Sequence, residues 1–156
     1  MHLVIVVLTM LALPLGSILI ELRASVGGPG LWPLIGKWFV FWGVGIRLAI
    51  AGGRQIIRPE LTATGIFGVT DKAAFPLAQE LGFWNLAIGV VAIATLKWPD
   101  WLVPVALAAA LFYGMAGALH VASGDRNFAA STAMISDLGI AALLAAFVVV
   151  TLSGGR

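Results

Sequence analysis

The chain has 156 residues, of which 61% are hydrophobic and only 10% are charged, with a mean hydropathy of +1.06 and a formal net charge of +2 at pH 7. Soluble domains usually carry about 25% charged residues, so this chain has too few polar residues to cover a globular surface. The composition argues against a soluble enzyme, a disordered tail and a nucleic-acid binder, and it predicts an all-α, polytopic transmembrane helical bundle.

The length of the chain limits that bundle to one domain. A helix needs about 20 residues to cross about 30 Å of hydrocarbon, so the chain suffices for four or five spans with short connections and leaves no room for an extramembrane domain. The chain has no cysteine, so neither an Fe–S cluster nor a thiolate zinc site can form within it. The composition does not identify any other cofactor.

Five apolar runs follow one another along the chain, and each predicts a membrane span. The predicted spans are residues 3–20, 38–57, 77–96, 101–122 and 128–152. No basic residue precedes the first run and no small-residue cleavage site follows it, so we expect a retained helix, bent at Pro14, and not a signal peptide. The second run carries Arg47 at its middle, which leaves open whether it crosses the membrane completely.

The connections between the runs contain turn residues and interfacial side chains. Residues 26–33 are rich in glycine and proline and predict a loop. Trp32, Lys37 and Trp38 are typical of side chains that anchor a helix at the membrane interface. Residues 59–76 have an apolar centre that is too short to cross, so we expect this connection to lie at the interface or to fold back partway. Basic residues divide equally between the two sides, which predicts no orientation.

Small residues recur at every fourth position on two of the predicted spans. The stripes are Gly45, Ala49 and Gly53 on the second span, and Ala110, Gly114 and Ala118 on the fourth. Small side chains let the backbones of neighbouring helices approach closely, which helps helices to associate in lipid. The pattern favours packing within the chain over a dimer seam, although it permits both.

Several polar side chains fall within the apolar runs, where a charge costs about 3 kcal/mol unless it is paired or hydrated. The titratable or charged ones are Arg47, Glu80, His120 and Asp137, and the neutral ones are Asn85, Tyr113 and Asn127. These residues are the candidate functional site.

Arg47 lies too far from either end of its run to reach the headgroups, so we expect it to face the bundle and to pair with a carboxylate. Glu80 can be that counter-ion. Alternatively, Glu80 lies in the first turns of its helix after Pro76, where a carboxylate interacts favourably with the helix dipole. Arg54 and Arg58 share the helix face of Arg47 and are expected to extend to the headgroups.

His120 follows Tyr113 by seven positions, so the two share one helix face. We expect the imidazole to be buried and to hydrogen-bond an acid or amide such as Asp137, because an unpaired polar group costs roughly 1–3 kcal/mol. Two interpretations of Asp137 stay open. It caps a helix that starts beside it, or it lies inside a helix that starts near Asn127 and can meet His120. The lack of a helix breaker before Asp137 favours the second.

Two groups of residues carry a resemblance to a known family. Residues 80–89 contain the pattern Glu-x-Gly-Phe-x-Asn-Leu-x-x-Gly, and Gly117-x-x-His120 is followed by Asn127-Phe128-Ala129 and Asp137. Over about residues 40–150 the chain resembles a family of uncharacterised small bacterial membrane proteins, and its general plan is similar to the DoxX-like group. The resemblance implies a multi-pass protein of the bacterial cytoplasmic membrane in which Glu80, Asn85, His120, Asn127 and Asp137 belong to one buried network. It implies no reaction.

Three functions are compatible with the sequence. The first, which the lack of cysteines and of a nucleophile–base motif favours, is a non-catalytic subunit or scaffold that contacts lipids and other membrane proteins or further copies of itself. The second is a proton- or solute-coupled transporter that uses the four titratable residues named above, since ionisable groups inside spans often mark relays. The third is a quinone- or haem-associated redox component, with Trp84, Tyr113 and His120 lining a quinone pocket. An enzyme is not favoured.

Overall fold

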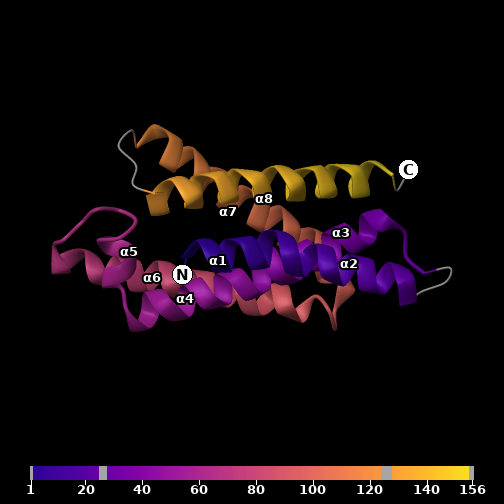
Figure 1. Cartoon of the computed structure of the whole chain (residues 1–156), viewed down its shortest axis with the longest axis horizontal. Coiled ribbons are helices and arrows are strands. Elements are labelled where there is room, and N and C mark those ends of the chain that lie inside the picture. Colours follow the sequence, from indigo (N-terminus) through magenta and orange to yellow (C-terminus); the bar gives the residue numbers. More distant parts are fainter. Residues whose placement is uncertain (1, 25–27, 124–127, 155–156) are drawn as a thin grey trace.

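The computed structural model describes residues 2–24, 28–123 and 128–154, and within these ranges every regular element is helical. Five helices are long and apolar enough to cross a membrane: Leu3–Ala24, Leu31–Ile57, Lys72–Ala94, Pro99–Ala122 and Phe128–Ser153. The predicted all-α bundle is therefore confirmed, with five membrane-length helices in the described part of the chain (Figure 1).

The five long helices consist of shorter elements. The first comprises α1 (His2–Val7), η1 (Leu8–Ala12) and α2 (Leu13–Ala24), and the second comprises α3 (Leu31–Phe39), η2 (Val40–Ile46) and α4 (Arg47–Ile57). The connection that follows contains α5 (Glu60–Ala63) and η3 (Lys72–Ala74), which leads into α6 (Phe75–Ala94). The short η4 (Pro99–Trp101), α7 (Leu102–Ala122) and α8 (Phe128–Ser153) come next.

The second long helix begins earlier than we expected, at Leu31 instead of residue 38. Pro33 is accommodated in its first turn, where a missing N–H leaves no helical hydrogen bond unmade. The glycine- and proline-rich loop is correspondingly shorter, and Lys37 becomes part of the helix. With these added turns the helix is long and apolar enough to cross a membrane, despite Arg47 at its middle.

Two π-helical stretches, η1 and η2, interrupt the first two long helices. A π-helical turn is wider than an α-helical one, and such turns are frequent at functional sites. Pro14 follows η1 closely, and η2 ends directly before Arg47. The two stretches also contact each other. Pro14 led us to expect a bend in the first helix, but no residue pattern indicated these wider turns beside the arginine.

The long helices pack as two close pairs. α7 lies along α8 and α4 lies along α6, whereas α6 and α7 contact each other little although they are neighbours in the chain. Figure 1 shows α8 with part of α7 at the top of the view, and α4 and α6 at the bottom. The two helix pairs, α4 with α6 and α7 with α8, are therefore separate packing units, and they enclose the site described below.

Glycines bring the backbones of α4 and α6 into contact. A Cβ atom built on Gly52 would lie only 2.6 Å from the carbonyl oxygen of Gly82. Gly45, seven positions earlier, lies on the same seam, where a Cβ would lie 3.2 Å from the backbone nitrogen of Ile93. Gly53 of the expected stripe does not lie on this seam, because a Cβ there would meet nothing within 4 Å. Ala49 of the expected stripe does lie on the seam, because a Cβ on Gly89 of α6 would lie 2.7 Å from its backbone nitrogen, so the expected spacing of four positions holds from Gly45 to Ala49 and Gly52 takes the place of Gly53.

The small-residue stripe on α7 is only partly used within the chain. Ala110 is buried, and a Cβ on Gly114 would lie 3.8 Å from the Cβ of Ala141 on α8. Ala118 is exposed. Packing within the chain accounts for the first two positions of this stripe.

One end of the bundle, where α2 ends and α3 begins, is closed by polar contacts between the first two long helices. Lys37 Nζ lies 2.8 Å from both carboxylate oxygens of Glu21, and Trp38 Nε1 donates to the same carboxylate at 2.8 Å. Trp42 Nε1 donates to Ser17 Oγ at 3.0 Å. We call this region the closed end.

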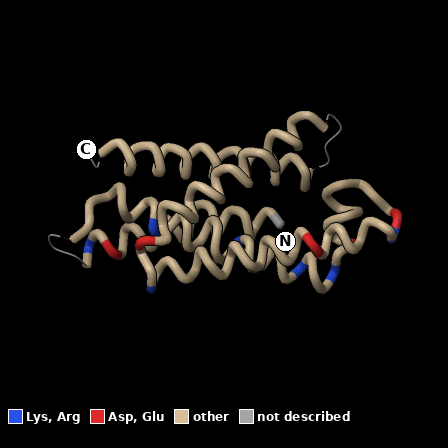
Figure 2. Tube along the Cα trace, turned by 180° about the vertical axis from the view of Figure 1, so that it is seen from behind, with Lys and Arg blue, Asp and Glu red and all other residues tan. Residues whose placement is uncertain are grey.

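Charges gather toward the two ends of the molecule, and the middle is almost free of them (Figure 2). Around the turn between α6 and α7, the rings of Trp98 and Trp101 stack at 5.1 Å, and Lys97 Nζ lies 5.2 Å from the centre of the Trp98 ring. Tryptophan and lysine side chains at helix ends are typical of the membrane interface.

Candidate functional site

Arg47, at the middle of the second long helix, is paired with a carboxylate. Its Nη2 lies 2.7 Å from Asp137 Oδ1 on α8, and both side chains are buried. The pair joins α4 to α8 across 90 positions of the chain. Arg47 therefore has the acidic partner that we expected for it, but that partner is Asp137 and not Glu80.

Three further groups surround the guanidinium. Nη2 also donates to Ser136 Oγ at 2.8 Å, Nη1 lies 3.7 Å from Met10 Sδ, and the guanidinium carbon lies 4.9 Å from the centre of the Tyr113 ring. The Tyr113 hydroxyl in turn donates to the carbonyl of Gly43 in η2 at 2.9 Å. The arginine thus receives partners from η1, α7 and α8.

The presence of two buried charges in the interior requires an explanation. Removing one partner of a buried ion pair is strongly destabilising, yet replacing both by apolar residues of the same volume is often neutral or stabilising. The hydrogen bonds to Arg47 explain how the charge is tolerated in the interior. They do not explain why the chain has an ion pair there instead of two aliphatic side chains, and this points to a use of the charges beyond stability.

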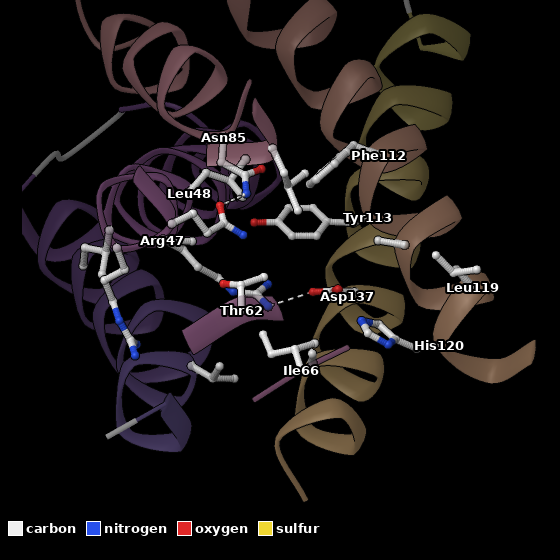
Figure 3. Close-up of a pocket in the computed structure, with 18 of the residues that line it drawn as sticks. Arg47, Leu48, Thr62, Ile66, Asn85, Phe112, Tyr113, Leu119, His120 and Asp137 are labelled. Carbon is white, nitrogen blue, oxygen red and sulfur yellow. Dashed lines mark hydrogen bonds and ion pairs between the residues drawn. The ribbon is translucent and has the colours of Figure 1, made fainter. Parts of the chain in front are cut away.

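The ion pair lies on the wall of a cavity of about 380 Å³ between the two helix pairs (Figure 3). The polar residues of the lining are Arg47, Arg54, Gln55, Thr62, Asn85, Tyr113, His120 and Asp137. The remaining lining is apolar and includes Leu48, Phe112 and Leu119. Ligand sites in proteins commonly have this size and this combination of an apolar wall with a few polar groups.

The connection after α4 covers part of this cavity. Thr62 of α5 is buried, and it lines the cavity together with Ile66 and Phe67. Gly68 follows with a φ of +70°, a left-handed conformation that glycine adopts without strain. Residues of this connection therefore belong to the site.

His120 and Asp137 line the cavity from α7 and α8. Figure 3 shows the imidazole directed toward the Asp137 carboxylate. His120 is half-buried, whereas we expected it to be buried between helices. Because α8 begins at Phe128, Asp137 lies well inside a helix, and the interpretation of Asp137 as a helix cap is wrong.

Asn85 pairs with a residue of α4 that sequence reasoning did not single out. Its Nδ2 donates to Gln55 Oε1 at 2.7 Å, and both side chains are buried. Asn85 Oδ1 is buried without a hydrogen-bond partner in the described part of the protein. An unsatisfied buried oxygen costs about 1–3 kcal/mol, so its place on the cavity wall indicates room for a donor from a ligand or from water.

Three candidate residues do not join this arrangement. Glu80 is exposed on α6 and does not line the cavity, so placing it in the buried network was wrong. The reason is helical geometry, since five positions turn the helix by about 140° between Glu80 and Asn85. Trp84 is 51% exposed and also lies off the cavity, so it does not line a pocket with Tyr113 and His120. Asn127 lies outside the described residues.

Sequence reasoning also missed four lining or supporting residues: Arg54, Gln55, Thr62 and Ser136. Arg54 was expected to extend to the headgroups, but it lines the cavity. Gln55 follows Arg47 by eight positions, a spacing that places both on one helix face and could have indicated a shared role. Ser136 carried a weaker signal, its position beside Asp137.

No group of three or more His, Cys, Asp or Glu side chains that could hold a metal ion occurs among the described residues. The chemistry that the site offers is instead ionic and protic. Two guanidiniums, a carboxylate and an imidazole line one cavity, and two amides and two hydroxyls complete the polar lining.

The fold and the site define a class of protein: a bundle of five membrane-length helices with a buried arginine–aspartate pair on the wall of a cavity between two helix pairs. A family model matches residues 3–154, so the chain belongs to DUF6790, a family of unknown function. This confirms the expected membership of an uncharacterised family, and the match includes the first helix, which the motif resemblance did not need. No curated protein and no solved structure matches the chain.

Proposed function

We propose that this chain is a multi-pass integral membrane protein of the bacterial cytoplasmic membrane, with a plan like that of the DoxX-like group. We further propose that it binds a small ligand in the cavity and acts as a proton- or solute-coupled transporter. The observation that carries the proposal is the buried Arg47–Asp137 pair on the wall of a cavity of about 380 Å³. Intramembrane ion pairs beside a cavity are typical of substrate and proton pathways.

A change of partner at Asp137 provides the coupling in this proposal. His120 faces the carboxylate that Arg47 holds. When His120 takes up a proton, Asp137 gains a second cationic partner, which weakens its hold on Arg47. Because Arg47 and Asp137 tie one helix pair to the other, this loosening lets the two pairs move relative to each other.

Proton movement in vesicles tests the transport role. The full chain is reconstituted into vesicles loaded with a pH-sensitive dye, which are exposed in turn to short-chain acids, amines and alcohols. We expect a protein-dependent pH change with at least one of these classes, and a loss of about tenfold or more in His120→Ala and in Asp137→Asn.

Glu80→Gln is the matched control, because Glu80 is a titratable residue on the same bundle that lies off the cavity. It should retain the parent rate. The transport role is refuted if protein-containing and empty vesicles behave alike with every solute, or if His120→Ala and Asp137→Asn transport as well as Glu80→Gln.

A subunit or scaffold role is the second candidate, and the surface of α8 favours it. Gly139, Ala142 and Ala146 share one exposed face of this helix, and a Cβ on Gly139 would meet nothing within 4 Å. Such a small-residue face suits close contact with a helix of another subunit. If it forms one, Gly139→Leu abolishes co-purification of a partner or of a second copy from native membranes, while Gly53→Leu on α4 leaves it unchanged.

A further inference from the structure

We infer that the ligand of this cavity is a single-chain amphiphilic anion whose head group is held by Arg54. This inference rests on the proposed function, because it names the ligand of the same cavity. It follows from the balance of charge in the lining, from the apolar rest of the lining, and from the size of the space.

The charged lining has one cation in excess. Arg47 is neutralised by Asp137 at 2.7 Å. Arg54 also lines the cavity and is half-buried, yet the structure records no ion pair for it among the described residues. A partly buried guanidinium without a carboxylate is a ready partner for an anion, because it donates several charge-assisted hydrogen bonds in a fixed plane.

A neutral hydrogen-bond donor lines the same cavity as this cation. Thr62 is buried on the same cavity wall, where its hydroxyl can donate to an anionic head group. The polar lining therefore favours an anion over a cation of the same size.

The rest of the lining suits an alkyl chain. Ile50, Met115 and Leu119 line the cavity and are also exposed on the surface of the bundle, so the cavity reaches the surface along an apolar edge. In a protein surrounded by lipid, that edge faces the acyl chains, and a lipophilic molecule can enter from the bilayer. A charged solute without an apolar body would leave most of this lining uncovered.

The volume limits the ligand to one short chain. At about 30 Å³ for each water-sized group, the cavity of about 380 Å³ holds roughly a dozen non-hydrogen atoms. Decanoate has this size, whereas a lipid with two acyl chains is several times larger. The head group can be a carboxylate or a phosphate, since both accept from a guanidinium in the same geometry.

Photolabelling tests the inference. The full chain in phosphatidylcholine vesicles is exposed to a decanoic acid that carries a diazirine on its chain, and the labelled residues are mapped by mass spectrometry. We expect saturable labelling of cavity residues of α7, such as Met115 and Leu119. Decanoate and decyl phosphate should compete with the label, whereas decanol and decyltrimethylammonium should compete at least about tenfold less well, because they lack a negative charge. The stronger of the two competing anions identifies the head group.

Arg54→Gln should lower labelling about tenfold, and Arg54→Lys, which keeps the charge, should lower it less. Arg58→Gln is the matched control, because Arg58 follows α4 but is exposed and does not line the cavity. The inference is overturned if decanol competes as well as decanoate, if Arg58→Gln loses as much labelling as Arg54→Gln, or if the label spreads over the outer faces of all helices.

The experiments can refute the transport role and the ligand class independently of each other. If proton movement in vesicles still depends on His120 but decanoate neither binds nor competes, the transport role stands and the ligand class is wrong. If decanoate labels the cavity in an Arg54-dependent manner but no solute moves protons, the ligand site stands and the transport role is wrong.

Discussion

The closed end and the cavity region of this bundle use polar side chains in opposite ways. At the closed end, Glu21 and Lys37 form a half-exposed ion pair at the bundle surface, between helices that adjoin in the chain. In the cavity region, Arg47 and Asp137 are buried and connect helices that are far apart in the chain.

The apolar packing of the two regions differs as well. Near the closed end, Leu34 and Phe147 are almost fully buried, and a Cβ on Gly36 would lie 2.2 Å from the Phe147 ring, so the helices interlock without charges. In the cavity region, α6 and α7 contact each other little, and an open space lies between the helix pairs. Because the same chain packs well without buried charges in one region, the charges of the other region are not a general requirement of its packing, and this supports the proposed ligand site.

Among the variants, Arg47→Ala should show the difference between the two regions most clearly. It leaves the Asp137 carboxylate buried without its cation, which should lower the free energy of unfolding by about 3–5 kcal/mol. Unfolding in mixed detergent and SDS micelles measures the change. Arg58→Ala, at an exposed position, should change it by less than about 0.5 kcal/mol.

The double variant Arg47→Met with Asp137→Leu sharpens this test, because it removes both charges and keeps apolar volume. It should recover most of the stability that Arg47→Ala loses. A double variant as unstable as Arg47→Ala would show that the ion pair is needed for folding and would weaken the argument that it is kept for function.

Gly52→Ala should show how rigid the wall formed by α4 and α6 is. The added Cβ would meet the Gly82 carbonyl oxygen at 2.6 Å, so the two backbones must separate at a cost of about 1–3 kcal/mol. Gly53→Ala is the adjacent control, since its Cβ meets nothing, and it should be neutral or slightly stabilising. Equal effects of the two variants on the melting temperature would contradict the glycine seam.

Tyr113→Phe should cost less, because it keeps the ring beside Arg47 and removes only the hydroxyl that donates to Gly43. Side-chain hydrogen bonds between membrane helices contribute about 0.6 kcal/mol on average. The same unfolding assay measures the loss. A loss as large as that of Arg47→Ala would mean that the Gly43 bond, and not the ion pair, holds the cavity region together.

Glu21→Gln at the closed end should have the smallest effect. Its ion pair with Lys37 is partly exposed, and such pairs contribute less than about 1 kcal/mol. The loss should shrink further at 1 M salt, because screening is then strong within a few ångströms. A loss that is large and independent of salt would show that the closed end, like the cavity region, depends on a desolvated charge.

The sequence alone determined the class of fold and the approximate positions of the five long helices. Apolar runs of about 20 residues and the turn residues between them are local features, and the hydrophobic effect and backbone hydrogen bonding act on them locally. The sequence also indicated that Arg47 needs a buried acidic partner, because that requirement follows from the cost of an unpaired charge in lipid.

Only the tertiary structure decided which residues meet. Asp137, and not Glu80, faces Arg47, and Gly52, and not Gly53, faces α6, because a single position turns a helix by about 100° and so changes which neighbour a side chain meets. The π-helical turn of η2 shifts this register further just before Arg47. The cavity itself exists because the α4–α6 and α7–α8 pairs pack more closely within themselves than against each other, a balance of contacts between distant segments that no local pattern of residues contains.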